Sequence, residues 1–328
     1  MSADPISVDV VVATFNRPDN VRVCLEHLAR QTLAPVETVV VDSSPHRLTA
    51  DVVAGFPGVR YVRNDAGPGT LATSRAIGVA ETRSDVVAFV DDDAYAEPHW
   101  LERLVAPYVD PSVGAVGGRA SNGRPGEEHE GLDAVGRLLP DGTLTGNFAA
   151  DTGRDLDVDH VLGANMSVRR SALEQIGGIV DLYPGTCLRE ESDIMLRLGQ
   201  AGWRIVYTPA ALVEHVAAPY TKGRRFDLRY TFYGHRNHVV LLSHAFGLGA
   251  PILRRYVGTS LRGVGDAVAE GARSAVARDR TVRQRVRSLG GKALHASATL
   301  GGLAAGTSVA ARTRLRARRA GAASVTGG

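Results

Sequence analysis

Short apolar runs rich in β-branched residues recur near the start of the chain, and polar residues follow each of them. VDVVVAT occupies residues 8–14, ETVVVDSS residues 37–44 and DVVAFV residues 85–90. Near-continuous apolar runs of this kind are typical of strands that are buried on both sides of a parallel sheet. Segments with helical spacing lie between them, at residues 20–31 and 71–82. The alternation predicts an α/β fold with a mostly parallel sheet flanked by helices.

The pattern becomes less regular beyond residue 110. VGAVGG, residues 113–118, predicts one more strand, and residues 160–178 predict a strand that runs into a helix. A helix is predicted at residues 191–202, where Gly ends it, and the strand WRIVYTP follows. Residues 121–157 are rich in Gly, Asp and Glu, so we expect a loop or a solvated flap there.

The charge is distributed unevenly along the 328 residues. Residues 216–328 contain 20 Lys and Arg against 4 Asp and Glu, whereas residues 1–215 contain 18 against 31. This division separates an acidic body from a basic tail. We therefore predict one domain at residues 1–220, where the acidic residues that could serve catalysis lie, and a basic helical C-terminal region at residues 221–328.

Three interpretations of the basic region are open. Aromatic residues alternate with arginines in KGRRFDLRYTFYGHR, residues 222–236, which fits nucleic-acid binding, an anionic membrane surface, or solvated arginines on packed helices. We favour the membrane surface and expect no nucleic-acid partner. Residues 293–311 are nearly long enough to span a bilayer, but they are mostly Ala, Gly, Ser and Thr. This composition favours a packed or interfacial helix pair over a membrane span.

The cysteines and the N-terminal residues indicate where in the cell the protein is expected. Cys24 and Cys187 lie far apart and no CxxC occurs, so neither a disulfide framework nor a zinc ribbon is expected. The N-terminal residues lack a basic start followed by an apolar stretch, and we therefore expect no signal peptide. The expected location is cytoplasmic, with peripheral attachment at the inner side of the cell membrane.

Three consecutive aspartates, Asp91, Asp92 and Asp93, directly follow the run DVVAFV. Neighbouring carboxylates repel one another, but a divalent cation neutralises them, and Mg²⁺ typically takes one or two carboxylates plus substrate phosphates. Ligands of open α/β sheets bind beyond the carboxyl ends of the strands, where ATFNRP and Asp42 are also expected. The alternative is an exposed acidic turn or a helix cap before PHWLERL. The convergence of three motifs favours a metal site.

An ordered series of segments resembles family 2 glycosyltransferases with the GT-A fold, of a bacterial, actinobacterial type. It covers roughly residues 7–216 in the order that the family has. The resemblance implies an inverting, hexosyltransferase-type enzyme that moves a sugar from a UDP- or dTDP-sugar to the hydroxyl of a lipid-linked or cell-envelope glycan. The segments are VVVATFNRPDNVRVCLEHLARQT, ETVVVDSS, GPGTLATSRAIGVAET, VVAFVDDDAYAEPHWLERL, GANMSVRRSALEQIGG and EESDIMLRLGQAGWRIVYTPAALVEH.

The resemblance assigns donor-binding roles to several residues. Thr14, Asn16 and Arg17 fall in the first nucleotide-binding loop. Asp42 falls where a carboxylate accepts a hydrogen bond from the base N–H of a uridine- or thymidine-type nucleotide. Arg75 falls on the helix near the diphosphate. Without the resemblance, Asp42 would be a strand-terminal turn residue and Arg75 part of a solvated helix surface.

The same resemblance implies a site for Mn²⁺ or Mg²⁺. Asp91 and Asp93 are the outer members of a DxD motif, Asp93 being the better candidate for direct metal contact, and Asp92 is placed near the ribose. His215 falls at the position where a histidine often completes the metal site in relatives. Without the resemblance, a single histidine is more often structural. The metal would help the nucleoside diphosphate to leave as a Lewis acid.

EESD, residues 190–193, resembles the family motif that carries the catalytic base. The base falls at Glu191, where many relatives have Asp, and Asp193 is the second candidate. A helix N-terminus also favours acids through its dipole, which explains part of this acidity. Asn165 resembles a position near the acceptor site, and an Asn there could equally satisfy backbone groups in a turn.

Two other classes of protein share parts of this pattern. A nucleotidyltransferase that makes nucleotide-sugars would need a Gly-rich, basic phosphate loop after the first strand, and ATFNRPDN is not such a loop. A non-catalytic nucleotide-binding protein of the same fold would have less reason to keep a nearly complete set of acids.

Overall fold

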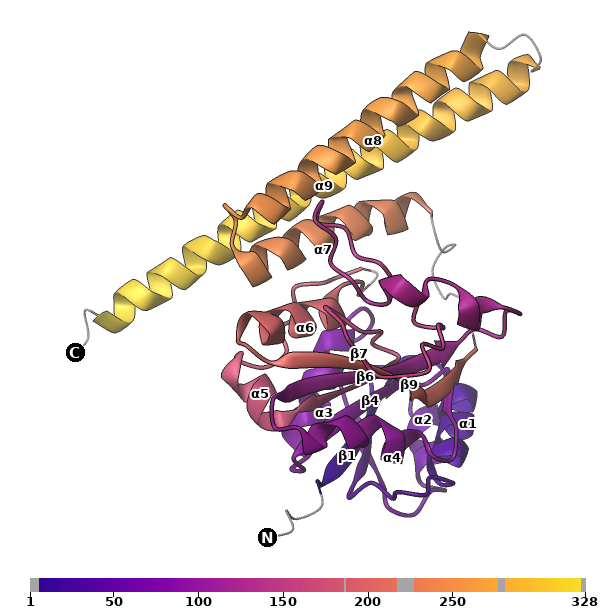
Figure 1. The fold of residues 1–328 in the computed structure, drawn as a ribbon, viewed down its shortest axis with the longest axis vertical. Helices are drawn as coiled ribbons and strands as arrows, with labels where there is room; N and C mark the ends of the chain where they lie inside the picture. The colour runs from indigo at the N-terminus through magenta and orange to yellow at the C-terminus, as the bar shows by residue number, and fades with distance from the viewer. Residues whose placement is uncertain (1–5, 186, 217–226, 277–280, 326–328) are drawn as a thin grey trace. The chain divides into compact units, whose positions relative to one another are not determined.

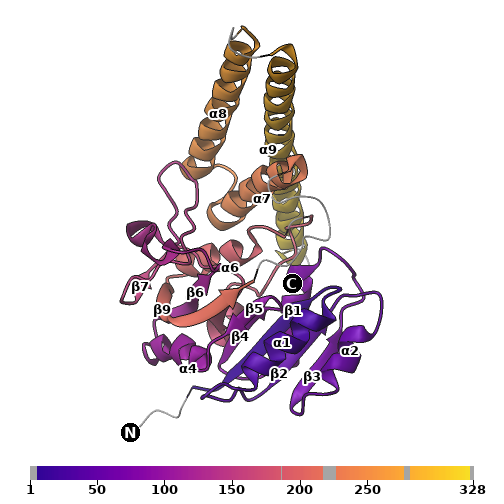
Figure 2. The same cartoon turned by 90° about the vertical axis from the view of Figure 1, so that its right-hand side faces the viewer.

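The computed structural model describes residues 6–185, 187–216, 227–276 and 281–325. The chain divides into two compact units (Figures 1 and 2). The first unit comprises Met1–Leu138 and Leu144–Pro219, and the second comprises Leu139–Thr143 and Tyr220–Gly328. A short internal segment of the chain therefore belongs with the C-terminal helices.

The first unit is built on one sheet, which has nine strands among the described residues. The strand order is β3-β2-β1-β4-β8-β6-β9-β5, with β7 paired to β9. Neighbours β3, β2, β1 and β4 are parallel, as are β6 and β9, whereas β8, β5 and β7 run antiparallel to their partners. The sheet is thus mostly parallel, and the predicted fold class is confirmed. The strands are β1 (Val8–Thr14), β2 (Thr38–Asp42), β3 (Val59–Arg63), β4 (Val86–Asp91), β5 (Ala94–Ala96), β6 (Val113–Ser121), β7 (Leu156–Asp157), β8 (Asn165–Arg169) and β9 (Arg204–His215).

Helices cover both sides of the sheet, which explains the continuous apolar runs. Val10 and Val12 of β1 pack in the core that contains side chains of α1, α2 and α4. Val11, between them, packs in the core that contains side chains of α3, α5 and α6. Successive strand residues point to opposite sides, so both sides of β1 must be apolar. The helices are α1 (Pro18–Leu28), α2 (Leu48–Val53), α3 (Leu71–Glu81), α4 (Trp100–Val105), α5 (Arg170–Gln175) and α6 (Glu190–Gln200).

Gly78 lets α3 approach β1 closely. A Cβ atom at this position would lie 2.3 Å from a methyl group of Val11. Real Cβ atoms do not come that near, so a larger residue here would push the helix off the sheet or distort the strand. This close packing fixes α3, which carries Arg75.

The second half of the unit differs in detail from the sequence prediction. The strand predicted to end at Pro209 continues to His215. The register against β6 shifts after Gly118, which pairs with Thr208, while the next residue, Arg119, pairs with Leu212. Proline is tolerated because residues 209–211 fall outside the regular pairing, where no ladder hydrogen bond from its nitrogen is needed. Residues 122–155 are largely irregular, with two short 3₁₀ turns, Glu127–His129 and Leu132–Ala134.

The second unit contains three helices among its described residues: α7 (Leu228–Phe246), α8 (Pro251–Val276) and α9 (Val282–Val325). Asp227 caps α7 by accepting a hydrogen bond from the N–H of Tyr230 at 2.8 Å. The aromatic and basic stretch at residues 222–236 lies partly in α7, and residues 222–226 lie outside the described part of the chain.

Residues 293–311 form a continuous stretch of α9, which runs antiparallel to α8 (Figure 1). Glycines on this stretch bring it against α7, since Cβ atoms at Gly302 and Gly306 would lie 2.4 Å and 2.6 Å from the carbonyl oxygens of Phe232 and Arg236. The small residues therefore serve helix packing. Within the described residues, no helix combines the length and the apolarity that crossing a membrane requires.

Candidate active site

The carboxyl ends of β1, β2 and β4 meet at one edge of the sheet. Thr14 at the end of β1 lies in register with Asp42 at the end of β2. Ala13 lies in register with Asp91 at the end of β4. The parallel pairing thus brings together three polar segments that are far apart in the sequence, at the edge where ligands of such sheets bind.

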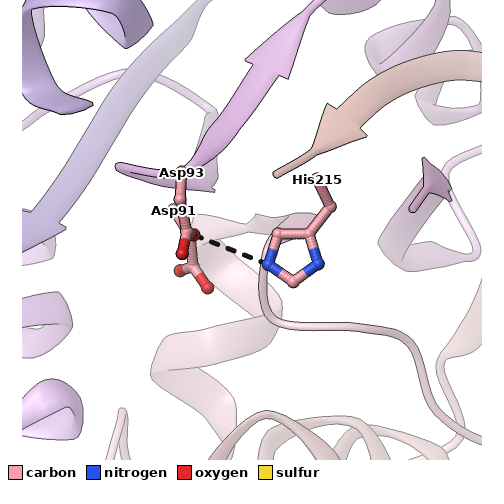
Figure 3. A group of neighbouring side chains, drawn as sticks. All are labelled: Asp91, Asp93 and His215. Carbon is pink, nitrogen blue, oxygen red and sulfur yellow. Dashed lines mark ion pairs between the residues drawn. The ribbon is translucent and has the colours of Figure 1, made fainter. Parts of the chain in front are cut away.

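Asp91, Asp93 and His215 form a group whose candidate ligand atoms all lie within 4.8 Å of one another. Figure 3 shows the two carboxylates side by side next to the imidazole. His215 Nε2 lies 3.5 Å from Asp93 Oδ1. His215 reaches this place because β9 extends past Pro209 and pairs with β5, where His215 lies opposite Ala94. Two carboxylates and one imidazole suit Mn²⁺ or Mg²⁺, so the residues present fit such an ion.

Arg17 supplies a positive charge to the same carboxylates. Its Nη1 donates to Asp93 Oδ2 at 2.9 Å and to Asp92 Oδ1 at 3.0 Å. Burial alone would raise the pKa of Asp93, but His215 and Arg17 outweigh it and hold the pKa below its usual value. The ionised form that a metal requires is therefore favoured.

Asp92 points into the protein. Its side chain accepts a hydrogen bond from Thr14 Oγ1 at 2.6 Å, in addition to the one from Arg17. Only 3% of the residue is exposed, and burial raises its pKa to about 7. In this arrangement Asp92 holds the first loop in place, so contact with a ribose would require the loop to open.

Asp42 is fully buried, with both carboxylate oxygens engaged. Oδ1 accepts from the backbone N–H and the hydroxyl of Ser44, an Asx turn. Oδ2 accepts from the hydroxyl of Tyr61 at 3.1 Å. The hydroxyl of Ser44 in turn accepts from the backbone N–H of Asn16 at 2.8 Å, and Asn16 is exposed with a φ of 56°. Ser44 and Tyr61 were not predicted as site residues, although the DSS sequence is a local signal for the turn.

Arg75 joins the aspartate cluster to the start of α6. This buried arginine donates from Nη2 to Asp91 Oδ1 at 2.9 Å and to the carbonyl oxygen of Gly163 at 2.8 Å. Its Nη1 forms an ion pair with Glu190, which is also buried. A Cβ atom at Gly163 would lie 2.9 Å from the guanidinium, so this position favours glycine. Glu191, the candidate base, directly follows Glu190. Arg75 therefore links the start of α6 to Asp91, one of the three candidate metal ligands.

Glu191 lies in the first turn of α6, directly after a turn in which Cys187 and Arg189 have φ values of 57° and 81°. Left-handed backbone of this kind at non-glycine residues is costly and is concentrated at functional sites. Burial raises the pKa of Glu191 above its ordinary value. A carboxylate with a raised pKa is the stronger base when ionised, as general base catalysis requires.

Ser192 and His160 adjoin this carboxylate and were missed by the sequence prediction. Ser192 Oγ lies 3.3 Å from both Glu191 Oε1 and His160 Nδ1. His160 Nε2 lies 2.8 Å from the carbonyl oxygen of Thr145, so Nε2 carries the proton and Nδ1 accepts. Burial lowers the pKa of His160 to about 4, and the ring is neutral at ordinary pH. One hydroxyl proton therefore serves either the histidine or the carboxylate.

Asp193 has a different environment from Glu191. It is 1% exposed, Oδ1 accepts from the hydroxyl of Tyr183 at 2.8 Å, and Oδ2 accepts from Arg197 Nε at 2.7 Å. Arg197 also donates to the carbonyl oxygens of Ile176 and Gly178. The ion pair lies within α6, and its two residues anchor the segment that precedes this helix through Tyr183 and the two carbonyl oxygens. Asp193 thus has a structural role here.

Asn165 has a structural environment as well. Its amide donates to the carbonyl oxygens of Arg119 and Ala211, and its oxygen accepts from the indole of Trp100. The residue is fully buried between strands. Of the two interpretations of Asn165, the structure favours the one in which it satisfies backbone groups.

Comparison with known proteins links this arrangement to one family. The sequence model described as "Glycosyl transferase family 2" matches residues 9–177. The glucosyl-dolichyl phosphate glucuronosyltransferase of Haloferax volcanii is 30% identical over 225 residues, which cover 64% of this chain and 69% of that protein. The pre-mycofactocin glycosyltransferase of Mycobacterium tuberculosis is 32% identical over 175 residues, 50% of this chain, and the matched part is 33% of that protein's length.

A solved structure shares the fold. The mannosyltransferase PcManGT of Pyrobaculum calidifontis, in complex with GDP-Man and Mn²⁺, superposes with a TM-score of 0.58 at 20% sequence identity. The superposition covers 94% of this chain and 87% of that one.

Proposed function

Because the chain belongs to glycosyl transferase family 2, we propose that it is a metal-dependent, inverting enzyme that moves a sugar from a nucleotide diphosphate to an acceptor hydroxyl. The observation that carries this proposal is the group Asp91, Asp93 and His215, tied through Arg75 to the helix that bears Glu191. Residues 1–220, which contain the sheet, would be the catalytic domain. Residues 221–328 would form a separate basic helical domain.

Asp91, Asp93 and His215 would hold Mn²⁺ or Mg²⁺ on the donor diphosphate. The ion would act as a Lewis acid that stabilises the negative charge of the leaving diphosphate. Arg17 would support the same charge, because its guanidinium already lies at Asp93 and it is the last residue of the first loop, directly before α1. Thr14 and Asn16 would shape that loop, which Asp92 and Ser44 hold in place.

Glu191 would take the proton from the acceptor hydroxyl as that oxygen attacks the anomeric carbon. A single displacement inverts the configuration at that carbon. When Glu191 is ionised, the hydroxyl of Ser192 can donate to it, and when it is protonated, the same hydroxyl can turn to His160. In the protonated state Glu191 can itself donate to Ser192 Oγ, so the carboxyl group, the hydroxyl and His160 Nδ1 are all paired. In the ionised state Ser192 donates to Glu191, and Nδ1 loses this donor.

Asp42 supports a uridine or thymidine donor, since a carboxylate accepts the imide N–H that these bases carry. The hydroxyl of Tyr61 already donates to Asp42 Oδ2, the oxygen that would receive this hydrogen bond. The nucleobase would therefore have to displace the Tyr61 hydroxyl. The acceptor is proposed to be a lipid-linked or cell-envelope glycan. The support is the name of the Haloferax volcanii relative, a glucosyl-dolichyl phosphate glucuronosyltransferase, and the net positive C-terminal region, for which we propose a peripheral membrane contact from the cytoplasmic side.

A thermal-shift screen of UDP, dTDP, GDP and CDP, each with Mn²⁺, Mg²⁺ or EDTA, tests the donor site. A ligand that binds only the folded state raises the melting temperature by mass action. Stabilisation by UDP or dTDP that disappears in EDTA and in Asp93→Asn is expected. Asp133→Asn, at an exposed aspartate of the same unit, is the matched control and should behave as the wild type. No shift with any nucleotide, or an unchanged shift in Asp93→Asn, would contradict the proposal.

A further inference from the structure

The second unit contains a groove of about 510 Å³ whose lining includes three arginines. Arg254, Arg255 and Arg262 all belong to α8, and all three are exposed. The opposite wall comes from Pro140 and Asp141, in the internal segment that belongs to the same unit. Positive charge is therefore gathered in a concave part of the surface of this unit.

The spacing along α8 creates the hollow. Arg254, Gly258 and Arg262 follow one another at intervals of four residues, so they share one side of the helix. Gly258 lines the groove and has no side chain to fill it. A Cβ atom there would have Arg262 Nη1 as its nearest neighbour, at 3.9 Å. The space between the two arginines is thus open down to the backbone.

The groove residues carry an excess of positive charge. Asp141 is the acid among them, and its Oδ1 already accepts from the backbone N–H and the hydroxyl of Thr143. Arg255 donates to the carbonyl oxygen of Pro140 at 3.3 Å, and Arg262 donates to Thr259 Oγ1 at 3.0 Å, so these partners are neutral. Three guanidinium groups against one carboxylate suit a ligand with two negative charges. Guanidinium forks match the oxygens of a phosphate group.

Apolar side chains continue from the groove along the same helix. Leu261 and Val268 are 47% and 54% exposed. They follow Arg254 by seven and fourteen residues, which places them on nearly the same side of α8 as this arginine. Arginines beside an exposed apolar stripe are typical of helices that bind the surface of an anionic membrane.

We propose that this groove binds the phosphate headgroup of an anionic lipid, with Leu261 and Val268 against the acyl region. The proposal deepens the membrane contact in the proposed function and gives it a defined site. It does not depend on the catalytic assignments, since every groove residue belongs to the helical unit.

Vesicle sedimentation of the full-length protein tests the proposal. The vesicles are phosphatidylcholine alone and phosphatidylcholine mixed with phosphatidic acid. The groove variant is Arg255→Gln/Arg262→Gln, and the matched control is Arg283→Gln/Arg287→Gln, which removes the same charge from exposed positions of α9. Because each arginine near an anionic surface contributes about 1 kcal/mol, the groove variant should bind mixed vesicles roughly 30-fold more weakly. The control should change by less than about 2-fold, because its arginines lie outside the groove.

Inorganic pyrophosphate separates the possible sources of the phosphate. It should displace the wild-type protein from mixed vesicles at concentrations where sodium chloride of equal ionic strength does not. Equal losses in the two variants would show diffuse charge attraction and overturn the proposal. Groove-dependent binding of pyrophosphate without binding to mixed vesicles would assign the site to a soluble phosphate, and also overturn it.

The thermal shift with UDP or dTDP and Mn²⁺, measured in the same variants, distinguishes this proposal from the catalytic one. Both variants should keep the nucleotide shift. If no nucleotide shift occurs while groove-dependent vesicle binding does, the catalytic proposal fails and the lipid site stands. Melting temperatures of both variants without ligand should equal that of the wild type, because the substituted side chains are exposed.

Discussion

The guanidinium of Arg17 lies 2.9 Å from a carboxylate oxygen of Asp93, which is also one of the three residues grouped for a metal ion. The same nitrogen lies 3.0 Å from Asp92. A side-chain cation therefore partly neutralises the cluster in which a divalent cation is proposed. Arg17 would therefore compete with a bound metal ion for the negative charge of these carboxylates until a nucleotide diphosphate added further negative charge.

Arg17→Ala is therefore expected to tighten the binding of Mn²⁺ in the absence of nucleotide. The expected gain is roughly 3- to 10-fold, about what remains of a contact ion pair after solvent screening. Sugar transfer should fall at the same time, because the loop and the diphosphate lose a cation. Isothermal titration with Mn²⁺ measures the first effect, and Arg22→Ala, at an exposed arginine of α1, is the control. Weaker Mn²⁺ binding in Arg17→Ala alone would show that Arg17 supports the metal site instead.

Glu191 and Asp193 should respond differently when each carboxylate is replaced by its amide. Glu191→Gln should lower the rate of transfer by about 10²–10⁴-fold with little change in stability, as expected for loss of a general base. Asp193→Asn should lower the free energy of unfolding by about 2–4 kcal/mol, because it leaves Arg197 without its buried partner. Initial rates and urea unfolding, measured for both variants, separate the two roles. Full activity in Glu191→Gln would remove it as the base.

The pattern of apolar runs was sufficient to predict the fold class, because a strand covered by helices on both sides must be apolar throughout. The same local reasoning predicted WRIVYTP as the last strand, which ends at Pro209. The structure continues to His215 because β6 supplies a compensating register shift. That shift depends on the partner strand, which lies about ninety residues earlier in the sequence and is not visible from local periodicity.

The candidate site could be predicted only where residues sit at strand ends or in a motif. Asp91, Asp93 and His215 are such residues, and their roles as metal ligands remain predictions. The pairs that orient the site join distant positions, as Arg75 does with Glu190. No sequence motif marks Tyr61 or His160. Each contributes to the site through one hydrogen bond, Tyr61 with Asp42 and His160 with Ser192. Tertiary packing creates these contacts, so the sequence alone could not identify them.

His160 should make stability depend on pH in an identifiable window. Its pKa is about 4 in the folded protein against 6.5 ordinarily, so between these values the unfolded chain binds the proton more tightly. Stability from His160 is thus fully present above pH 6.5 and is lost as the pH falls toward 4. The loss amounts to about 2–4 kcal/mol. In His160→Gln, the difference in unfolding free energy from the wild type should shrink over this window, measured by urea unfolding at several pH values. His129→Gln, at an exposed histidine, should show no such trend, and a constant difference for His160→Gln would contradict the assignment.

Tyr61 and Asp42 together test how a nucleobase enters the site. If the imide N–H of uridine binds Asp42, the hydroxyl of Tyr61 must first release Oδ2, and breaking that hydrogen bond costs about 0.5–1.5 kcal/mol. Tyr61→Phe should therefore bind UDP roughly 2- to 10-fold more tightly. Asp42→Asn should bind UDP more weakly, since an amide accepts at a single oxygen and its NH2 group can only donate. Binding of UDP and CDP by titration in the presence of Mn²⁺ provides the measurement. CDP is the internal control because N3 of cytosine carries no hydrogen and accepts where the imide of uracil donates. An equal change for both nucleotides in Asp42→Asn would mean that Asp42 only supports the loop through Ser44, and the base would have to be recognised elsewhere.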